Sequence, residues 1–420
     1  MGGFFINLII NFFIMRHIII LIVITCLSLH SCKETSQING KSVKVIDVAG
    51  GVGKSRQVYL SEIADSIEYI PLETTPESLL SNPYYERIFY EKNILYFTQK
   101  NGIIKLFNSK GEYLCTFNRL GRGPQEYEQL GELQIDNMSG NIIIQSINKI
   151  LEYFPNGEFI RNIFLPAPDK IDNIYIGNFL KLGDSYFFSG SAISTNSVII
   201  TDSSLNVIKK LKYPPEEMDL VIKNKNSPPA FIYPYIYPYN DKIRLINGNN
   251  KYILSIDKNL SVDTVFIIDY GKFNVSDYPG SIYLPKLPYL WRYHYVFESD
   301  NYLFMCFHLG SLSDKPYKMV SRDGREWIDP NACALFNKKT EEFTFLDQSE
   351  INQIGFVDDI EGGPGIWPKY VSADNYMTSY IPAEEFIAYA ESHKVSEKYK
   401  TIAAGLEETD NYVFVRVKLK

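Results

Sequence analysis

The sequence predicts an all-β protein, a β-propeller with a short helical insertion near its C-terminus. From about Ser55 onward, short runs of β-prone residues alternate with turn dipeptides such as Asn-Gly and Asp-Gly. The 31 Tyr and 26 Phe in 420 residues favour strands over helices. A strand–turn–strand segment also recurs along the chain, which favours a propeller over a β-sandwich.

The recurring segment is clearest in two copies. KLFNSKGEYLCTF turns at Gly111, and EYFPNGEFIRNIF turns at Gly157. Looser copies lie at residues 198–211, 252–266 and 334–346. Each copy is typical of the outer hairpin of a propeller blade, and the spacing suits blades of roughly 40–50 residues that carry inserted loops.

The C-terminal part departs from this pattern. Pro382 opens a segment with acidic residues in its first turn, which is how a helix begins. Further on, Tyr399, Ile402, Ala403 and Leu406 fall at helical spacing and predict one apolar stripe. The chain ends in a predicted strand over residues 412–419. Pairing of this strand with one from the N-terminal part would close the ring.

The N-terminus predicts export. Residues 15–32 read MRHIIILIVITCLSLHSC, a basic start followed by an apolar run and a cysteine. Twelve apolar residues span about 18 Å as a helix, less than the roughly 30 Å of a bilayer core, so a secretory leader is expected. The residues before Cys32 resemble a bacterial lipobox. The alternatives are processing at Cys26 and a membrane helix over residues 4–29.

These features divide the chain into three parts. Residues 1–31 are the predicted signal peptide, with Met15 as the expected true start. Residues 32–54 are the lipidated Cys32 and a polar tether, and residues 55–420 form the propeller. We expect an outer-membrane lipoprotein that faces the periplasm or the cell surface.

Composition excludes some partners. The net charge is −7 with a pI near 5.5, and no Lys/Arg block stands out, so nucleic acid is not expected. Beyond the leader and Cys32, the cysteines are Cys115, Cys306 and Cys333. We interpret them as ordinary buried residues. One disulfide among them is the alternative in an oxidising compartment.

Four segments resemble those of a known family. Residues 67–80, the GRGPQEY loop at 121–127, the VDDIEGGPGIWP loop at 357–368 and the ending at 407–420 are similar, in this order, to six-bladed β-propeller lipoproteins of Bacteroidetes-type bacteria. The resemblance covers nearly all of the chain after Cys32. It implies six blades and export, but no established reaction.

The GRGPQEY loop carries the first candidate ligand-binding residue. Arg122 lies between two glycines that permit unusual backbone angles. A guanidinium there would bind a carboxylate or sulfate through two parallel hydrogen bonds. The alternative is that Arg122 pairs with Glu126 and braces a connection between blades.

The VDDIEGGPGIWP loop offers two further candidates. Asp358, Asp359 and Glu361 cluster oxygen ligands of the kind that calcium prefers, so Ca²⁺ is the one cofactor considered. Trp367 would offer a flat face to a sugar ring. The alternative is a tight loop whose tryptophan fills space between blades.

Two aromatic tracts give the best candidate ligand site. Tyr233 and Tyr235 belong to an alternating run that would share one face of a strand. Trp291, Arg292 and His294 crowd aromatic, cationic and imidazole groups into one short segment. Such mixtures line binding pockets. The alternative is that half of them face the core and the rest lie at an edge.

The sequence therefore favours a non-enzymatic binding or scaffold module for a glycan, a peptide or a partner protein. No catalytic motif is present. The alternative is an extracellular hydrolase or lyase that acts on glycan or peptide, with site residues drawn from several blades. A third reading is a structural subunit that binds only protein.

Overall fold

The structure is a computed structural model. It describes residues 36–38, 41–81, 87–165, 179–189, 196–215, 234–247, 251–274, 290–321 and 323–420. The chain divides into two compact units, Met1–Val45 and Ile46–Lys420. In the first unit, β1 (Ser36–Ile38) pairs antiparallel with β2 (Lys41–Asp47), with Ser36 opposite Val43. Strand β2 continues into the second unit.

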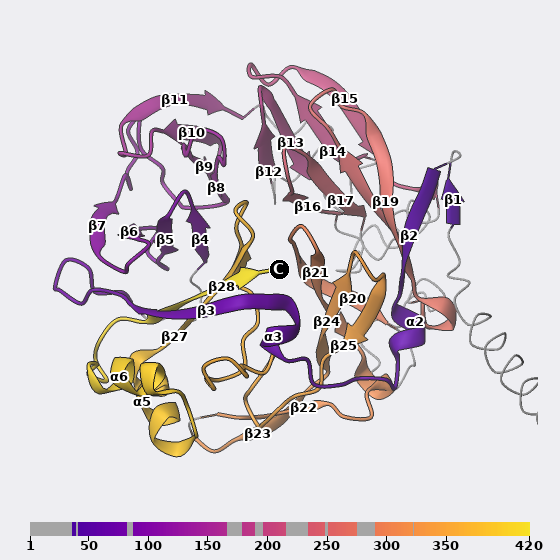
Figure 1. The fold of residues 1–420 in the computed structure, drawn as a ribbon. Helices are drawn as coiled ribbons and strands as arrows, with labels where there is room; N and C mark the ends of the chain where they lie inside the picture. The colour runs from indigo at the N-terminus through magenta and orange to yellow at the C-terminus, as the bar shows by residue number, and fades with distance from the viewer. Residues whose placement is uncertain are drawn as a thin grey trace, which may run out of the picture. The chain divides into compact units, whose positions relative to one another are not determined.

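The second unit is a six-bladed β-propeller, which confirms the predicted fold class (Figure 1). From the innermost strand outward, the first three blades are β4 (Ile88–Glu91), β5 (Ile94–Thr98), β6 (Ile104–Asn108) and β7 (Tyr113–Phe117); β8 (Leu133–Ile135), β9 (Ile142–Ser146), β10 (Lys149–Tyr153) and β11 (Phe159–Phe164); and β12 (Phe179–Leu182), β13 (Ser185–Ser189), β14 (Asn196–Thr201) and β15 (Val207–Lys212).

The other three blades also run from an innermost strand outward. They are β16 (Pro234–Pro238), β17 (Ile243–Asn247), β18 (Tyr252–Ile256) and β19 (Val262–Asp269); β20 (Trp291–Glu298), β21 (Tyr302–His308), β24 (Asn331–Asn337) and β25 (Glu342–Phe345); and β26 (Tyr370–Val371), β27 (Tyr376–Ile381), β28 (Val413–Leu419) and β3 (Ala64–Pro71). The fifth blade carries an inserted hairpin of β22 (Tyr317–Val320) and β23 (Glu326–Asp329).

The recurring sequence segments form the two outer strands of blades one to five, as predicted. Four of these turns begin with an Asn or Asp whose side-chain oxygen accepts backbone N–H groups further along the turn: Asn108, Asp202, Asp257 and Asn337. In the two clearest copies, Gly111 and Gly157 adopt φ angles of 85° and 82°, which glycine reaches without a steric cost. The repeat is therefore a repeat of turn chemistry.

The ring closes by pairing its two ends. Strand β28 lies antiparallel to β3, with Val413 opposite Pro71 and Val417 opposite Ile67. The last blade thus takes its outermost strand from the N-terminal part of the sequence, as predicted. Because the ring is closed, each blade packs against two neighbours and both faces of its sheet are covered.

The core lies between adjacent blades. It is built from large aromatic and branched side chains on both faces of each sheet. At the junction that closes the ring, Phe97 of the first blade stacks on Tyr412 beside β28, with ring centroids 5.3 Å apart. Burial of apolar area on both faces of every blade explains the near-continuous hydrophobic strands of the sequence.

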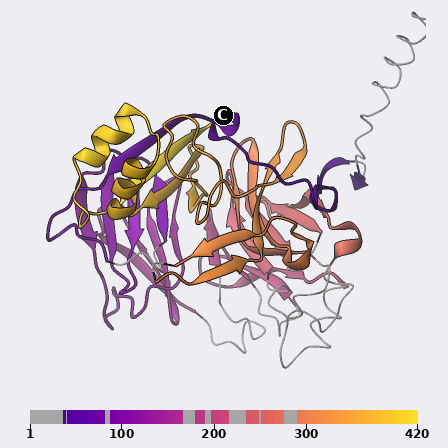
Figure 2. The same ribbon diagram turned by 90° about the horizontal axis from the view of Figure 1, so that it is seen from below.

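The predicted helical segment forms two helices, α5 (Ala383–Ser392) and α6 (Glu397–Ala404). The Ser396 side chain accepts the Tyr399 N–H and starts the second helix, which explains the break. The predicted stripe is confirmed, because Tyr399 and Ala403 are buried. Tyr399 stacks on Phe386 and meets the edge of Tyr69 in β3, so both helices cover the outer side of the last blade (Figure 2).

The compact unit begins before the predicted end of the tether at residue 54. Ile46 and Val48 are fully buried, and the Asp47 side chain accepts the N–H of Gly50 in the short helix α2 (Val48–Gly51). A second short helix, α3 (Leu60–Ile63), precedes β3. Cys32 and the predicted leader lie outside the described residues. No helix in the described ranges is long and apolar enough to cross a membrane.

Candidate functional site

An open cavity lies where the innermost strands of all six blades, and the turns that follow them, come together. Its lining takes one or more residues from each blade, among them Glu91, Gln134, Lys181, Tyr239, Asp300 and Tyr370. Its volume of about 70 Å³ accommodates a small polar group or a few water molecules. We call it the axial cavity.

Glu91 is a buried carboxylate in this cavity. The Tyr370 hydroxyl donates a hydrogen bond of 2.7 Å and the Ala373 N–H one of 3.0 Å, and both end on Oε1. Both hydrogen bonds fix the Glu91 side chain in the cavity wall through one of its two oxygens. Burial raises the pKa of Glu91, and the hydrogen bond from Tyr370 only partly opposes this. A raised carboxyl pKa in a cavity is a common property of binding and catalytic groups.

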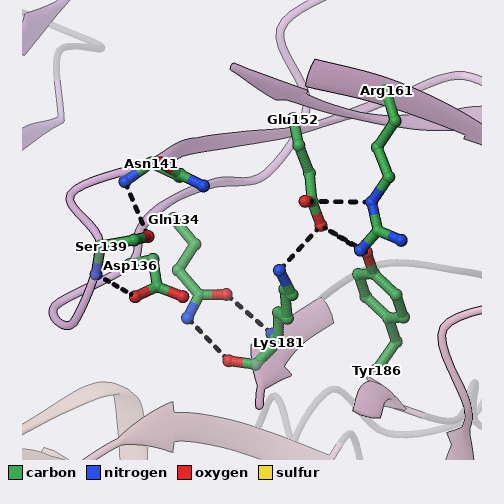
Figure 3. Close-up of polar contacts among 8 residues, drawn as sticks. All are labelled: Gln134, Asp136, Ser139, Asn141, Glu152, Arg161, Lys181 and Tyr186. Carbon is green, nitrogen blue, oxygen red and sulfur yellow. Dashed lines mark hydrogen bonds and ion pairs between the residues drawn. The ribbon is translucent and has the colours of Figure 1, made fainter. Parts of the chain in front are cut away.

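A polar network joins blades two and three beside the axial cavity (Figure 3). The Gln134 side chain accepts the Lys181 N–H at 2.7 Å and donates to the Lys181 carbonyl at 2.9 Å. The Lys181 ammonium lies 3.0 Å from Glu152, which also binds Arg161 and Tyr186. These donors outweigh the effect of burial and lower the pKa of Glu152. Lys181 is thus held as part of a structural ion pair.

A second network joins blades four and five. The Glu298 carboxylate accepts two hydrogen bonds from Arg244, at 2.9 and 3.0 Å, and the Lys338 ammonium lies 2.7 Å away. The Tyr237 hydroxyl donates a further hydrogen bond to Glu298. Burial lowers the pKa of Lys338, against the attraction of Glu298. This network fixes the cavity wall at β16 and β20.

The structure brings together residues from the two predicted aromatic tracts. The Arg292 guanidinium carbon lies 5.4 Å from the centre of the Tyr235 ring, and Tyr295 meets that ring edge-on at 6.1 Å. We call these three residues the Tyr235–Arg292 cluster. Arg292 is buried, whereas the Tyr295 side chain is 60% exposed. The cluster therefore offers one accessible aromatic ring, Tyr295, packed against a second ring, Tyr235, that contacts the Arg292 cation.

The pKa values of Arg292 and Tyr235 depend on burial and on ionisable groups from neighbouring elements. Burial lowers the pKa of Arg292, and the groups that oppose this are Tyr270, Tyr235 and Tyr237. Burial raises the pKa of Tyr235, and the carboxylate of Glu132 in blade two adds to this. The cluster shares β16 and β20 with the axial cavity, since Pro238 and Glu298 at the other ends of these strands line it.

Glu91→Gln should reveal the cost of burying this carboxylate. The variant keeps an acceptor for Tyr370 and Ala373 but carries no charge. Because burial raises the folded pKa of Glu91, the contribution of this group to wild-type stability is expected to fall as pH rises from about 4.3, the unfolded value, through the folded pKa. We expect the variant to melt at the same or a higher temperature than wild type at neutral pH. Its advantage should vanish in acid.

Thermal unfolding of both proteins across this pH range measures the effect. A wild-type protein that gains stability over the variant as pH rises would contradict it.

Several predicted site residues fall outside the described part of the structure. Tyr233 and the lipidation site Cys32 are among them. Trp291 and His294 have described backbone in β20, but their side chains are not described. Their roles in binding stay predictions.

Arg122 is placed on the surface. Its side chain is 92% exposed, and its Nε lies 3.9 Å from Glu128. Glu126, the alternative partner from the sequence, instead accepts the N–H of Gly123 at 2.8 Å. The loop is therefore fixed by its own carboxylate, and Arg122 does not line the axial cavity. Its predicted binding role remains a prediction.

The three carboxylates of the predicted calcium site point to different partners. Asp358 accepts backbone N–H groups within its own loop and the hydroxyl of Tyr69. Asp359 binds Ser61 of α3, and Glu361 binds Ser396 and Lys398. In the described residues, no group of three or more His, Cys, Asp and Glu side chains is placed to hold a metal ion. In this structure the three carboxylates bind different partners, and calcium binding at this loop stays a prediction.

Trp367 lies in a cluster of aromatic rings. It stacks on Phe356 with centroids 5.6 Å apart and meets Phe304 of the fifth blade edge-on at 6.1 Å. This placement corresponds to the alternative from the sequence, a tryptophan that fills space between blades. Its predicted contact with a sugar is not tested by this geometry.

Sequence reasoning missed the lining of the axial cavity. Glu91, Lys181 and Asp300 sit at ordinary strand ends and belong to no motif. Glu91, Lys181 and Asp300 each lie in or just after the innermost strand of a blade. An alignment of the blades with one another would therefore have placed these residues at similar positions. Their convergence depends on the ring, which no local pattern shows.

Comparison with known proteins gives one family match and several structural ones. The model of a domain of unknown function, DUF4934, matches residues 43–418. No curated protein matches the chain. A Bacteroides fragilis protein thought to be exported has a TM-score of 0.64 at 17% identity, over 90% of this chain and 99% of that one.

Two further structures are more distant. A member of the DUF4221 family from Bacteroides vulgatus has a TM-score of 0.46 at 13% identity, over 85% of this chain and 97% of that one. A virginiamycin B lyase from Staphylococcus aureus has a TM-score of 0.37 at 12% identity, over 84% of this chain and 100% of that one. At such identities, only the first likeness carries weight, and it concerns the fold.

Proposed function

This chain belongs to the DUF4934 family, and we propose that it is an exported binding module that recognises a glycan through the Tyr235–Arg292 cluster. The observation that carries this proposal is the exposed ring of Tyr295, held edge-on against Tyr235, which in turn contacts the buried Arg292. Sugar rings bind flat aromatic faces, and polar groups nearby give direction. A peptide or a protein partner is the competing ligand class.

Two ionisable side chains of the axial cavity, Lys181 and Glu298, favour a binding role over a catalytic one. Lys181 is held by Glu152, and Glu298 by Arg244 and Lys338. Side chains held by ion partners in this way use their hydrogen-bonding groups within the wall and are less free to contact a substrate. Their arrangement braces neighbouring blades and gives the cavity a rigid wall.

Glu91 favours the second candidate function, a hydrolase or lyase. Its pKa is raised by burial, and it lines a cavity to which every blade contributes. A carboxyl whose pKa is raised by burial is suited to general acid catalysis. Release of products from a glycan or peptide pool by the wild-type protein, but not by Glu91→Gln, would establish this alternative.

Export and lipid anchoring complete the proposal. They are supported by the basic and apolar leader and by the lipobox-like residues before Cys32. The similar Bacteroides fragilis protein is thought to be exported. A lipid on Cys32 would keep the propeller at the membrane surface.

Tyr295→Ala tests the binding site. We expect the substitution to weaken binding to the best ligand of a glycan array by about tenfold or more, because loss of an aromatic contact costs about 1–2 kcal/mol. The fold should survive, since the side chain is mostly exposed. Titration calorimetry with the purified protein measures the affinity.

Trp327→Ala is the matched control. This side chain is 49% exposed and lies on the inserted hairpin of the fifth blade, in β23. It should leave affinity unchanged. Equal effects of both substitutions, or binding of peptides alone on matched arrays, would count against the glycan site.

A further inference from the structure

Two cysteines face each other in the fifth blade. Cys306 in β21 and Cys333 in β24 are directly opposite in the antiparallel register. Their Sγ atoms lie 3.5 Å apart. Cys115, the third described cysteine, is exposed on β7 in the first blade.

The backbone at this pair has the geometry that a cross-strand disulfide needs. The N–H of Cys333 donates to the Tyr317 hydroxyl, and its carbonyl accepts the N–H of Leu346. Both groups therefore point away from Cys306, which makes this a non-hydrogen-bonded pair. Opposite Cα atoms in such pairs lie about 4.5 Å apart, within the range of roughly 4.4–6.8 Å found across disulfides.

We propose that Cys306 and Cys333 form a disulfide in the mature protein. Small side-chain rotations bring the sulfur atoms to a bonding distance of about 2.05 Å without backbone movement. The inference is independent of the proposed glycan site, because it rests on strand register alone. Export would deliver the protein to a compartment where such bonds persist.

The two thiols differ in access, which sets the order of the reaction. Cys306 is partly exposed and Cys333 is buried, and burial raises the pKa of the Cys333 thiol. The oxidant is a disulfide of the small-molecule or oxidoreductase class. The Cys306 thiolate attacks it, forms a mixed disulfide and releases one thiolate. Cys333 then loses its proton and attacks the Cys306 sulfur, which releases the second.

The bond would fix part of the blade that holds the candidate site. It would tie the second strand of this blade to the third and enclose the inserted hairpin β22–β23. Strand β20, which carries Arg292 and Tyr295, pairs with β21, with Tyr293 opposite Cys306. The disulfide is therefore expected to stiffen the sheet beneath the Tyr235–Arg292 cluster.

Peptide mapping tests the proposal without any variant. The full chain is produced with its leader, recovered from the cell envelope and alkylated without reduction. We expect a linked pair of peptides containing Cys306 and Cys333, lighter by about 2 Da than the reduced pair. Cys115 should be alkylated. The same chain recovered reduced from cytoplasm and treated with oxidised glutathione should form the same link, whatever its native compartment.

Two substitutions complete the test. Cys115→Ala should keep the link and melt at the wild-type temperature. Cys306→Ala should lose the link, and its melting temperature should be unaffected by a reductant that lowers that of the wild type. Alkylation of both Cys306 and Cys333 after glutathione treatment, or a link that includes Cys115, would overturn the proposal.

Discussion

Glu298→Ala is expected to lower the free energy of unfolding by about 3–5 kcal/mol, because it strands two buried cations. Arg244 and Lys338 both lie against this carboxylate, and the three side chains are almost fully excluded from solvent. Either charge alone in this environment lacks the water that would otherwise solvate it. The loss should appear as a lower midpoint in urea with an unchanged slope.

The control substitution removes one partner of an exposed ion pair. Glu397 lies 2.7 Å from Lys400 on the surface of α6. Glu397→Ala should cost less than about 1 kcal/mol, since solvent screens such pairs. The interpretation fails if the two substitutions cost the same. A double variant, Glu298→Met with Arg244→Met, removes both members of this ion pair. Its free energy of unfolding distinguishes the loss of their attraction from the cost of a buried Arg244 without a counter-ion. It should be more stable than Glu298→Ala.

Asp358→Ala is expected to cost about 3–5 kcal/mol for a different reason. Asp358 is buried and accepts hydrogen bonds from Ile360, Glu361 and Gly363 and from the hydroxyl of Tyr69. Alanine leaves these donors without an acceptor in the interior. The loop would lose its shape, and with it the contact between β3 and the loop before the last blade. Chemical unfolding measures the difference.

The neighbouring Asp359 provides the control, because it is exposed and binds only Ser61 among the hydrogen-bond partners found. Asp359→Ala should cost about 1 kcal/mol, as does loss of a helix cap. A calcium chelator should leave the melting temperature of the wild-type protein unchanged, since Asp358 is already saturated with donors. A fall in melting temperature that calcium reverses would support the predicted metal site.

The fold was accessible from the sequence because its signals are local. Turn chemistry at Gly111 and Gly157 repeats within short segments, and each segment forms a hairpin with its own neighbours in the chain. The helical stripe at Tyr399 was readable for the same reason. The break at Ser396 was missed, since it depends on a single cap within an otherwise helical pattern.

The candidate site was only partly accessible. The two aromatic tracts were identified in the sequence, and the structure places Tyr235 against Arg292 because β16 and β20 are innermost strands of adjacent blades. The metal site in the acidic loop stays a prediction. Clustered oxygens suggest a cation, and in this structure they accept hydrogen bonds from backbone and side-chain donors that the sequence does not reveal.

The repeated hairpins, the closing strand and the aromatic tracts could all be identified from the amino-acid sequence, because they follow from periodicity and turn preference over short distances. The shared cavity of Glu91, Lys181 and Asp300, and the pairing of Cys306 opposite Cys333, became visible in the folded chain alone. Both relations come from register between strands and from rotation of blades about a common axis. Such relations join residues far apart in the chain, and no local pattern encodes them.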